Sequence, residues 1–275
     1  MRLAVRHVTR YRFDPPLAHG LQRLRLSPKE THGQKVREWR MQLTGARLEA
    51  SYDDHNANHV SLVSLEPGTA ELAIACSGLV DTADRAGVLG PHTGKLPLWA
   101  FLAQTPLTRP GARMRELVAS LGSDRGDRLG LLHALSAAVL DAVAYAVGHT
   151  DSQTGAEEAV SAGKGVCQDH AQVFIGCARA LGAPARYVSG YLMMDDRVEQ
   201  EAGHAWAEAH IDGLGWVGFD VSNGISPDAR YVRLASGRDY AEAAPVTGIS
   251  FGAGSGGGRA ELSVSLAVEQ QAVQQ

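Results

Sequence analysis

The chain has 275 residues, of which 44% are hydrophobic and 20% charged, and its formal net charge is −4. This ordinary globular composition argues against wholesale disorder, and the mild acidic balance argues against a nucleic-acid-binding protein, which would carry a basic excess. No stretch approaches about 18 uninterrupted apolar residues, so no transmembrane helix is expected. Charged residues interrupt the N-terminal segment, so it lacks the apolar core of a signal peptide. The three cysteines are an odd number and do not form a disulfide framework. A reducing, cytoplasmic location is therefore expected.

Residues 1–95 are predicted to form a β-rich N-terminal domain. Short strand-like runs recur there at near-regular spacing, each bounded by turn residues, which favours a sandwich or barrel over βαβ units. The predicted strands are 3–13, 21–26, 39–43, 46–50, 58–63 and 71–76. The first is expected to stop at Asp14-Pro15-Pro16, and the glycines and prolines of 88–98 predict a linker.

Helical patterns begin near residue 111, where apolar residues recur every three or four positions. Helices are predicted from Met114, from a cap at Asp127 to about Val143, over 154–163 and over 168–181. The last of these ends at Gly182 with Pro184 beyond it, which is a typical helix stop signal.

The chain is then predicted to return to β structure. Strands are expected at 186–192, 204–211 and 215–220, followed by a flexible glycine run at 252–258 and a final strand at 262–268. The predicted domains are 1–95, a mixed domain over 96–250, and a glycine-rich linker with a final strand over 251–275.

Cys167 lies between a glycine-containing turn and the start of a predicted helix. The unpaired N–H groups and the positive end of the helix dipole favour a thiolate there, and the same N–H groups can stabilise an oxyanion. The alternative is a buried structural cysteine, which is what we expect of Cys177 in its helix and Cys76 in its strand.

His204 and Asp220 strengthen the interpretation of Cys167 as a nucleophile. If Ile211 pairs with Gly215 around a three-residue loop, Asp220 becomes the diagonal neighbour of His204 on one face of the hairpin. A register shifted by one residue would place Asp220 on the other face. His204 would then share the cysteine proton, and Asp220 would orient the imidazole.

Neighbouring residues admit several roles. Cys167, His170 and His204 could be imagined as metal ligands, but a fourth ligand at recognisable spacing is missing, so no metal is predicted. Asp169 is expected to pair with helix-terminal N–H groups or with Arg186.

Two further residues are candidates for contacts with substrate or oxyanion. Trp206 alternates to the face of His204, where it shields the site or packs in the core. Gln168 could donate to an oxyanion, although the backbone N–H of Cys167 is the firmer donor.

Several motifs resemble the bacterial transglutaminase-like cysteine peptidase family. They are Gly165-Val166-Cys167-Gln168-Asp169, the run from Ala183 to Tyr191, Gly203-His204-Ala205-Trp206-Ala207-Glu208, Gly215-Trp216-Val217-Gly218-Phe219-Asp220, Gly237-Arg238-Asp239-Tyr240 and Ala244-Pro245-Val246. The segments 7–11 and 24–28 look like the β-rich N-terminal region of the same family.

The resemblance implies an α+β fold: an N-terminal β-sandwich-like domain followed by a papain-like, transglutaminase-like catalytic domain. It implies Cys167, His204 and Asp220 as the catalytic triad. It also places an aromatic residue at Tyr145, which could hydrogen-bond an intermediate or serve packing.

Four departures from the family pattern bear on substrate preference. They are His170 in place of an aromatic residue, Gln172 in place of a histidine, Gly203 in place of a serine, and Val221-Ser222 in place of a Pro-Thr pair.

The expected activity is cysteine-dependent acyl transfer on a peptide or isopeptide bond through a thioester, with hydrolysis favoured over transamidation. It needs no cofactor. The alternatives are a catalytically silent peptide-binding module and a thioester-dependent acyltransferase. The expected partner is a peptide or protein substrate, with no nucleic acid and no membrane. Homo-oligomerisation stays open, and the N-terminal domain could be a substrate gate, a dimer surface or a rigid support.

Overall fold

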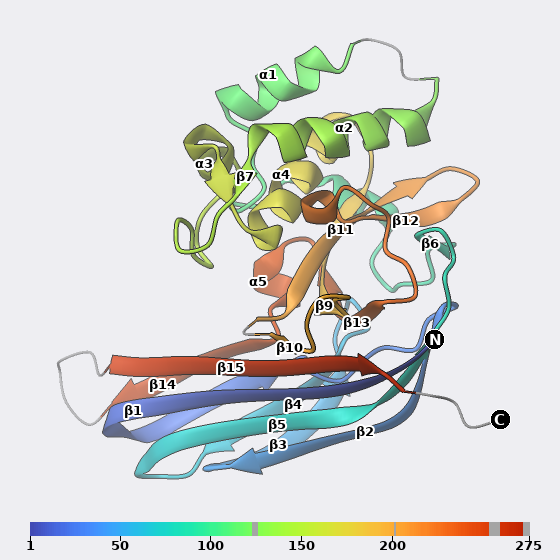
Figure 1. The fold of residues 1–275 in the computed structure, drawn as a ribbon. Coiled ribbons are helices and arrows are strands. Elements are labelled where there is room, and N and C mark those ends of the chain that lie inside the picture. Colours follow the sequence, from blue (N-terminus) through green and yellow to red (C-terminus); the bar gives the residue numbers. More distant parts are fainter. Residues whose placement is uncertain (123–125, 201, 253–258, 272–275) are drawn as a thin grey trace.

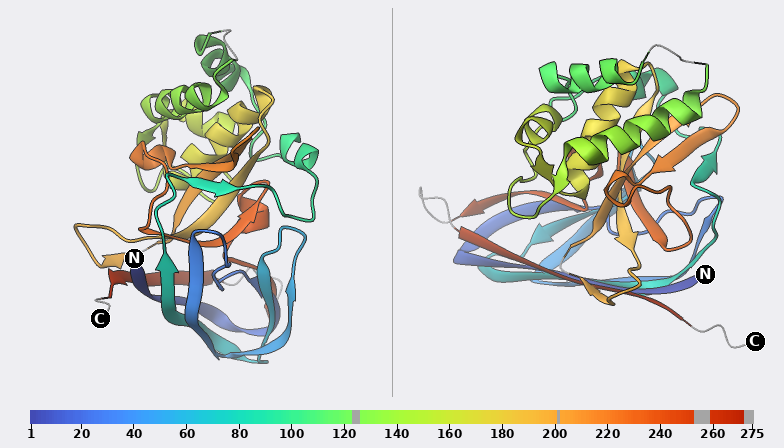
Figure 2. Two further views of the ribbon diagram at one scale, coloured as in Figure 1. Left: turned by 90° about the vertical axis from the view of Figure 1, so that its right-hand side faces the viewer. Right: turned by 45° about the horizontal axis from the view of Figure 1, so that its top comes forward.

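The computed structural model describes residues 1–122, 126–200, 202–252 and 259–271. Two mainly antiparallel sheets and a group of helices are stacked on one another (Figure 1). The helices cover one side of the smaller sheet and the larger sheet lies beyond its other side, as the rotated views also show (Figure 2). The predicted α+β class is confirmed.

The larger sheet, called here the N-terminal sheet, has eight strands within the described ranges. They are β1 (Arg2–Leu24), β2 (Gln34–Thr44), β3 (Ala46–Asp53), β4 (His59–Leu65), β5 (Thr69–Thr82), β10 (Glu199–Gln200), β14 (Val246–Gly252) and β15 (Arg259–Gln270). The first half of β1 lies between β5 and β15, and its second half pairs with β4 and β14. The predicted β-rich region is therefore confirmed.

The expectation that the first strand stops at Asp14-Pro15-Pro16 is wrong, because β1 continues to Leu24. The pairing of β1 with β5 is irregular between Arg12 and Leu17. Proline lacks a donor N–H and is tolerated where a ladder is interrupted. The two predicted strands are thus halves of one bent strand that changes partners at the prolines.

The smaller sheet, called here the catalytic sheet because it carries the predicted triad residue His204, runs in the order β13-β9-β11-β12-β6. Its strands are β6 (Val88–Gly90), β9 (Ala185–Leu192), β11 (His204–Ile211), β12 (Gly215–Phe219) and β13 (Tyr231–Gly237). A separate parallel pair joins β7 (Ala144–Tyr145) to β8 (Lys164–Gly165). The linker predicted over 88–98 begins instead with strand β6, whose backbone pairs with β12.

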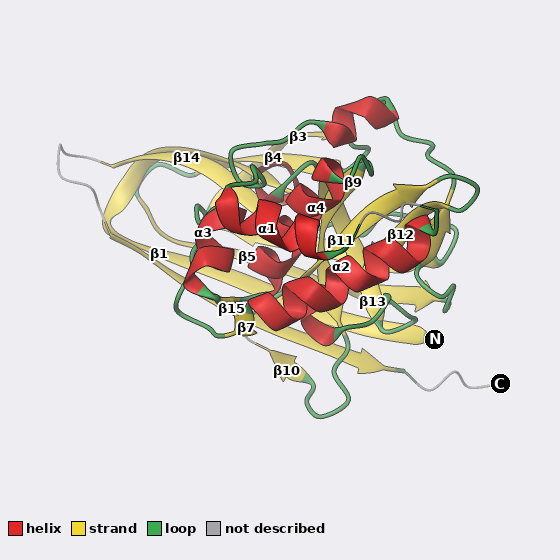
Figure 3. Ribbon diagram, turned by 90° about the horizontal axis from the view of Figure 1, so that it is seen from above, coloured by secondary structure: helices red, strands yellow, loops and turns green. Residues whose placement is uncertain are grey.

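Most of the helices lie above this sheet (Figure 3), whereas the short helix Tyr240–Ala243 lies beside β9 and β13, toward the N-terminal sheet (Figure 1). They are η1 (Leu98–Leu102), α1 (Ala112–Ser120), α2 (Arg128–Ala142), α3 (Ala156–Ala162), α4 (Cys167–Ala180), η2 (Val221–Asn223) and α5 (Tyr240–Ala243). The predicted cap is confirmed, since Asp127 accepts the Gly130 N–H at 2.8 Å. Among the described residues, none of the helices is long and apolar enough to cross a membrane.

The catalytic sheet is buried on both faces. Ala205, Ala207 and Ala209 of β11 pack with α2 and α4 in one core. Tyr191 of β9 and Val232 of β13 belong to a second core shared with the N-terminal sheet. Small residues on the α4 side let the helix approach closely, which places its first residue, Cys167, near the sheet.

Strands from both ends of the sequence complete the N-terminal sheet, because β14 and β15 pair with β1. The predicted domain ranges 1–95, 96–250 and 251–275 stay a prediction. Most of the predicted glycine run, residues 253–258, lies outside the described residues.

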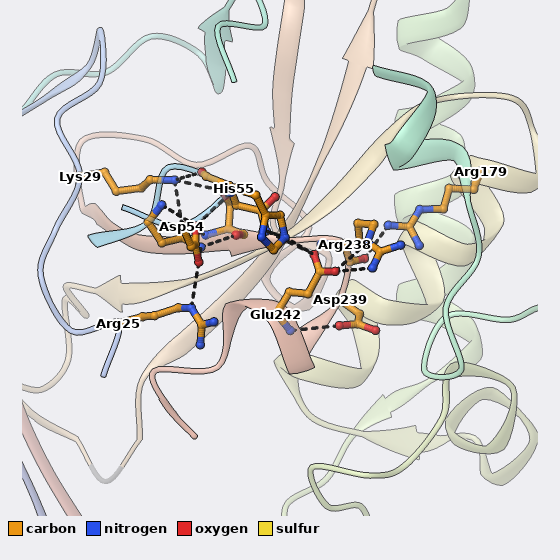
Figure 4. Close-up of polar contacts among 11 residues, drawn as sticks. Arg25, Lys29, Asp54, His55, Arg179, Arg238, Asp239 and Glu242 are labelled. Carbon is orange, nitrogen blue, oxygen red and sulfur yellow. Dashed lines mark hydrogen bonds and ion pairs between the residues drawn. The ribbon is translucent and has the colours of Figure 1, made fainter. Parts of the chain in front are cut away.

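We call the catalytic sheet and the helices packed on it the catalytic unit. On one side, polar side chains join it to the N-terminal sheet and its turns (Figure 4). The Asn58 amide donates to the Ser236 carbonyl at 2.8 Å, and the Lys29 ammonium donates to the Ser236 hydroxyl at 3.2 Å. Asn56, from the turn after β3, also donates to Glu242 at 3.3 Å. The two sheets are therefore joined by a hydrogen-bonded network as well as by apolar packing.

Candidate active site

Cys167 is the first residue of α4 and is partly exposed. The preceding backbone is fixed by Asp169, whose Oδ2 accepts the Val166 N–H at 2.8 Å and the Thr150 hydroxyl at 2.6 Å. A Cβ on Gly165 would lie 2.7 Å from that carboxylate oxygen, so the tight turn requires glycine there. Cys167 is thus held at a helix N-terminus, where its own N–H lacks an intrahelical acceptor.

His204 begins β11, and Asp220 follows the last residue of β12. Ile211 pairs with Gly215, so the predicted hairpin register is confirmed. The His204 Nε2 lies 2.6 Å from the Asp220 Oδ2, and the Asp220 side chain is fully buried.

Asp220 has two further side-chain donors that the sequence did not reveal. The Tyr231 hydroxyl donates to Oδ2 at 2.6 Å and the Asn223 amide donates to it at 2.7 Å. Burial by itself would raise the pKa of Asp220, but the hydrogen bonds from His204, Tyr231 and Asn223 outweigh it and lower the pKa. Asp220 is therefore held as a carboxylate.

His204 contacts Cys167 as well as Asp220. Burial by itself would lower its pKa, but hydrogen bonds to Asp220 and Cys167 and the charges of both raise the pKa to about 10. Because the His204 Nε2 is hydrogen-bonded to Asp220, Nδ1 is the ring nitrogen that remains for the Cys167 sulfur. The fold thus brings the three predicted triad residues together, with His204 between Asp220 and Cys167.

Cys167 and His204 line a cavity of about 280 Å³ between the two sheets. The catalytic unit contributes Tyr187 and Tyr240 to this cavity. The N-terminal sheet closes the opposite side, with His7, Thr9 and Tyr11 of β1 and Leu262 and Val264 of β15. We call this space the nucleophile cavity.

A second cavity of about 670 Å³ also reaches His204. Its lining is more polar and includes Arg197, Glu199, Gln200 and Asn223. Tyr145 lies at this cavity, and it is held beside the nucleophile turn because β7 pairs Tyr145 with Gly165. His204 therefore lies between two spaces of different character, and we call this one the polar cavity.

The other candidate residues occupy distinct positions. Tyr145 is 57% exposed, and burial together with the negative charges of Cys167 and Asp220 raises its pKa. Gln168 lines the nucleophile cavity, but its amide donates to the Asp151 carbonyl at 3.2 Å. Trp206 is buried and stacks beside His204 with ring centroids 6.4 Å apart, so it forms a wall behind the imidazole.

Two alternatives drawn from the sequence are wrong. His170 is fully buried, and its ring nitrogens contact the Ser222 hydroxyl at 2.9 Å and the Val143 carbonyl at 2.7 Å, so it cannot ligate a metal beside Cys167. Arg186 donates to Glu208 at 2.7 Å, whereas Asp169 caps α4.

The other two cysteines differ from Cys167 as predicted. Cys76 and Cys177 are each 1% exposed or less, and burial raises the pKa of both thiols to about 12. Neither can supply an appreciable thiolate near neutral pH.

Comparison with known proteins agrees with this architecture. Residues 115–221 match the transglutaminase-like superfamily, and residues 3–81 match the bacterial transglutaminase-like N-terminal region. An uncharacterized protein of Mycobacterium tuberculosis is 29% identical, covering 91% of this chain and 88% of its own. An uncharacterized protein of Mycobacterium leprae is 27% identical, covering 92% of this chain and 94% of its own.

A solved structure is similar throughout. The crystal structure of a "Putative Cysteine Protease" from Cytophaga hutchinsonii has a TM-score of 0.74 at 21% identity, covering 100% of this chain and 92% of that one. This likeness concerns the fold. The two matched regions together span well over half of the chain in the predicted order, so the chain carries a transglutaminase-like core and, ahead of it, a bacterial transglutaminase-like N-terminal region.

Proposed function

We propose that the protein is a cysteine-dependent acyl-transfer enzyme that cleaves a peptide or isopeptide bond. The observation that carries this is the position of His204, whose imidazole is hydrogen-bonded to the buried Asp220 carboxylate and interacts with the sulfur of the helix-terminal Cys167. A high imidazole pKa beside a thiol favours the thiolate–imidazolium pair, which is the reactive form of a cysteine nucleophile.

The proposed reaction has two halves. The Cys167 sulfur attacks the amide carbonyl carbon, and the carbonyl oxygen becomes an oxyanion that the Cys167 backbone N–H can stabilise. The C–N bond then breaks, and His204 gives its proton to the departing amine. A thioester remains on Cys167, and His204 takes a proton from the water that hydrolyses it.

The polar cavity supports hydrolysis over transamidation. The Arg197, Glu199, Gln200 and Asn223 side chains that line it favour hydration on one side of His204. Water there could reach the thioester without displacing an acyl group from the nucleophile cavity. A substrate amine entering the same space would give transamidation instead.

The nucleophile cavity suggests what kind of acyl group is bound. Tyr11, Tyr187 and Tyr240 surround it together with Leu262 and Val264, and its volume of about 280 Å³ suits one compact, largely apolar group. We infer that the substrate is a peptide or protein with such a residue on the acyl side of the cleaved bond. The N-terminal sheet would then select substrate.

The test is to expose the protein to a peptide library and identify the acyl group on Cys167 by mass spectrometry. Hydrolysis in ¹⁸O-water should place the label in the acid product, and adding an amine nucleophile should show the share of transamidation. Cys167→Ala should form no adduct and turn over no peptide. Peptide turnover by that variant equal to wild type would contradict the mechanism.

We also propose a reducing, cytoplasmic environment. Its support is that Cys76, Cys167 and Cys177 are all free thiols in the structure and that the mechanism needs one of them reduced. Fractionation of cells that produce the protein, with detection by antibody, would test the location.

A further inference from the structure

A third cavity, of about 870 Å³, shares no lining residue with the nucleophile cavity. Segments 27–32, 53–59 and 85–94 form its rim, and the catalytic sheet contributes Arg186, Arg233 and Trp216. We call it the basic cavity. It lies where the turns of the N-terminal sheet meet β9, β12 and β13, and no catalytic residue faces it.

The inner wall carries more positive than negative charge. Glu208 is fully buried, and its carboxylate accepts hydrogen bonds from both Arg233 and Arg186. One carboxylate cannot neutralise two guanidinium groups, so one positive charge is left over. Glu30 and Asp53 also line the cavity, but both are exposed, and Asp53 lies 3.4 Å from His59.

Lys29 adds a third cation. Its ammonium donates to the Asn56 carbonyl at 2.8 Å, the Asn58 amide oxygen at 2.9 Å and the Ser236 hydroxyl at 3.2 Å. All three acceptors are neutral, and no described carboxylate forms an ion pair with Lys29. The close-up shows the ammonium of Lys29 near the Asp54 turn, whose carboxylate is bound by Arg25 (Figure 4).

The charges around Lys29 act on it in opposite directions. Burial, together with the positive charges of Arg233 and Arg186, lowers the pKa of Lys29 to about 7, while Asp54 and Glu208 raise it. An added negative group in the cavity would relieve the repulsion among these cations.

Arg186 has N–H groups that donate no hydrogen bond to another described residue. Its Nε donates to Glu208. Its two terminal amino groups have no acceptor among the described residues, and both are accessible to solvent. The guanidinium lies 3.9 Å from the Trp216 ring centroid, which fixes its plane. A planar fork with free N–H groups matches the two oxygens of a carboxylate or phosphate.

We propose that the basic cavity is a binding site for an oxyanion, a small molecule that carries a carboxylate or phosphate group held by the Arg186 fork. Arg233 and Lys29 supply the surrounding positive charge. The site is independent of the proposed catalytic reaction, because it involves neither Cys167 nor His204.

The test is titration calorimetry of the full chain with inorganic phosphate and, separately, with glutarate. One or both should bind at one site, more weakly as salt is added, and should change the tryptophan fluorescence because Arg186 stacks on Trp216. Binding of only one anion identifies the head group. If neither binds at millimolar concentration, the proposal is overturned.

Two variants locate the site. Arg186→Lys keeps a positive charge opposite Glu208 but cannot form the fork, so it should weaken binding roughly tenfold or more. Arg113→Lys makes the matched change on the exposed face of α1 and should leave binding unchanged. Equal binding by wild type and Arg186→Lys would contradict the assignment. Cys167→Ala should bind the anion like wild type, which separates this proposal from the catalytic one.

Discussion

The imidazole Nδ1 of His7 lies 2.7 Å from the hydroxyl oxygen of Tyr191, although the two residues are 184 positions apart in the chain. His7 belongs to the N-terminal sheet and Tyr191 to the catalytic sheet, and both line the nucleophile cavity. The second ring nitrogen of His7 lies 2.9 Å from the Thr9 hydroxyl. The two sheets therefore meet through a buried hydrogen-bonded pair beside Cys167.

This contact predicts a loss of stability in acid. Burial lowers the pKa of His7 to about 4, below its ordinary value of 6.5. The unfolded chain thus binds a proton more readily than the folded one, so this contribution is complete above about pH 6.5 and is lost as the pH falls toward 4. The loss from this residue should reach at most about 3 kcal/mol.

The measurement is the free energy of unfolding against pH for wild type and for His7→Gln, which stays neutral. The variant should lose less stability than wild type between pH 6.5 and 4, and an exposed control, His149→Gln, should behave like wild type. Parallel curves for His7→Gln and wild type would contradict the assignment.

The His204–Asp220 pair predicts the alkaline side of the pH–activity profile. With a pKa of about 10, His204 keeps its proton until the pH rises through that value, and activity should then fall. Asp220→Asn removes a hydrogen-bonded negative charge, so the fall should move to lower pH. The rate kcat should drop roughly 10²-fold or more, because the imidazole loses its orienting partner.

The check is kcat/KM against pH for wild type and Asp220→Asn with one fluorogenic peptide. Asp212→Asn, an exposed residue of the same hairpin, is the matched control and should leave the profile in place. An alkaline limb that does not move in Asp220→Asn would show that another group sets it.

The hairpin that joins His204 to Asp220 was predictable because its signals are local. The three-residue loop determines the register, and a cysteine at a helix start needs no distant information. Tyr231 was missed because β13 alternates poorly and no turn signal marks it. Strand β6 has only three residues, and β14 contains glycines that weaken a strand pattern.

The wall of the nucleophile cavity could not be predicted from such patterns. Leu3 pairs with Gln270, and His7 meets Tyr191, through contacts that span most of the chain. Local periodicity contains no information on which distant strand completes a sheet. Sequence reasoning therefore left the role of the N-terminal region open, and the structure places it against the nucleophile.

Selective alkylation should distinguish the enzyme from a silent binding module. At neutral pH iodoacetamide should modify Cys167 first, because Cys76 and Cys177 are buried with pKa values near 12. His204→Ala should slow the modification of Cys167, since it removes the imidazole that stabilises the thiolate. Peptide mapping by mass spectrometry gives the rate at each cysteine, and equal rates at all three would favour the binding module.

Removal of the Tyr231 hydroxyl should weaken the support of the Asp220 carboxylate. Tyr231→Phe leaves Asp220 with His204 and Asn223 as side-chain donors, so the free energy of unfolding should fall by about 1–3 kcal/mol. The rate kcat should fall less than in Asp220→Asn, with KM little changed. Tyr52→Phe, on an exposed residue of β3, is the matched control, and a Tyr231→Phe variant as stable as wild type would contradict this role.

Substrate selection by the N-terminal sheet is tested at Tyr11, a half-buried residue of β1 that lines the nucleophile cavity. Tyr11→Ala enlarges the cavity without touching the triad, so the kcat/KM ratio of bulky to small acyl residues should rise, by roughly tenfold. Its neighbour Arg10 is exposed and lines none of the cavities described here, so Arg10→Ala is the matched control. If Tyr11→Ala keeps the wild-type preference while both proteins turn over the same peptides, the N-terminal sheet supports the catalytic unit without selecting substrate.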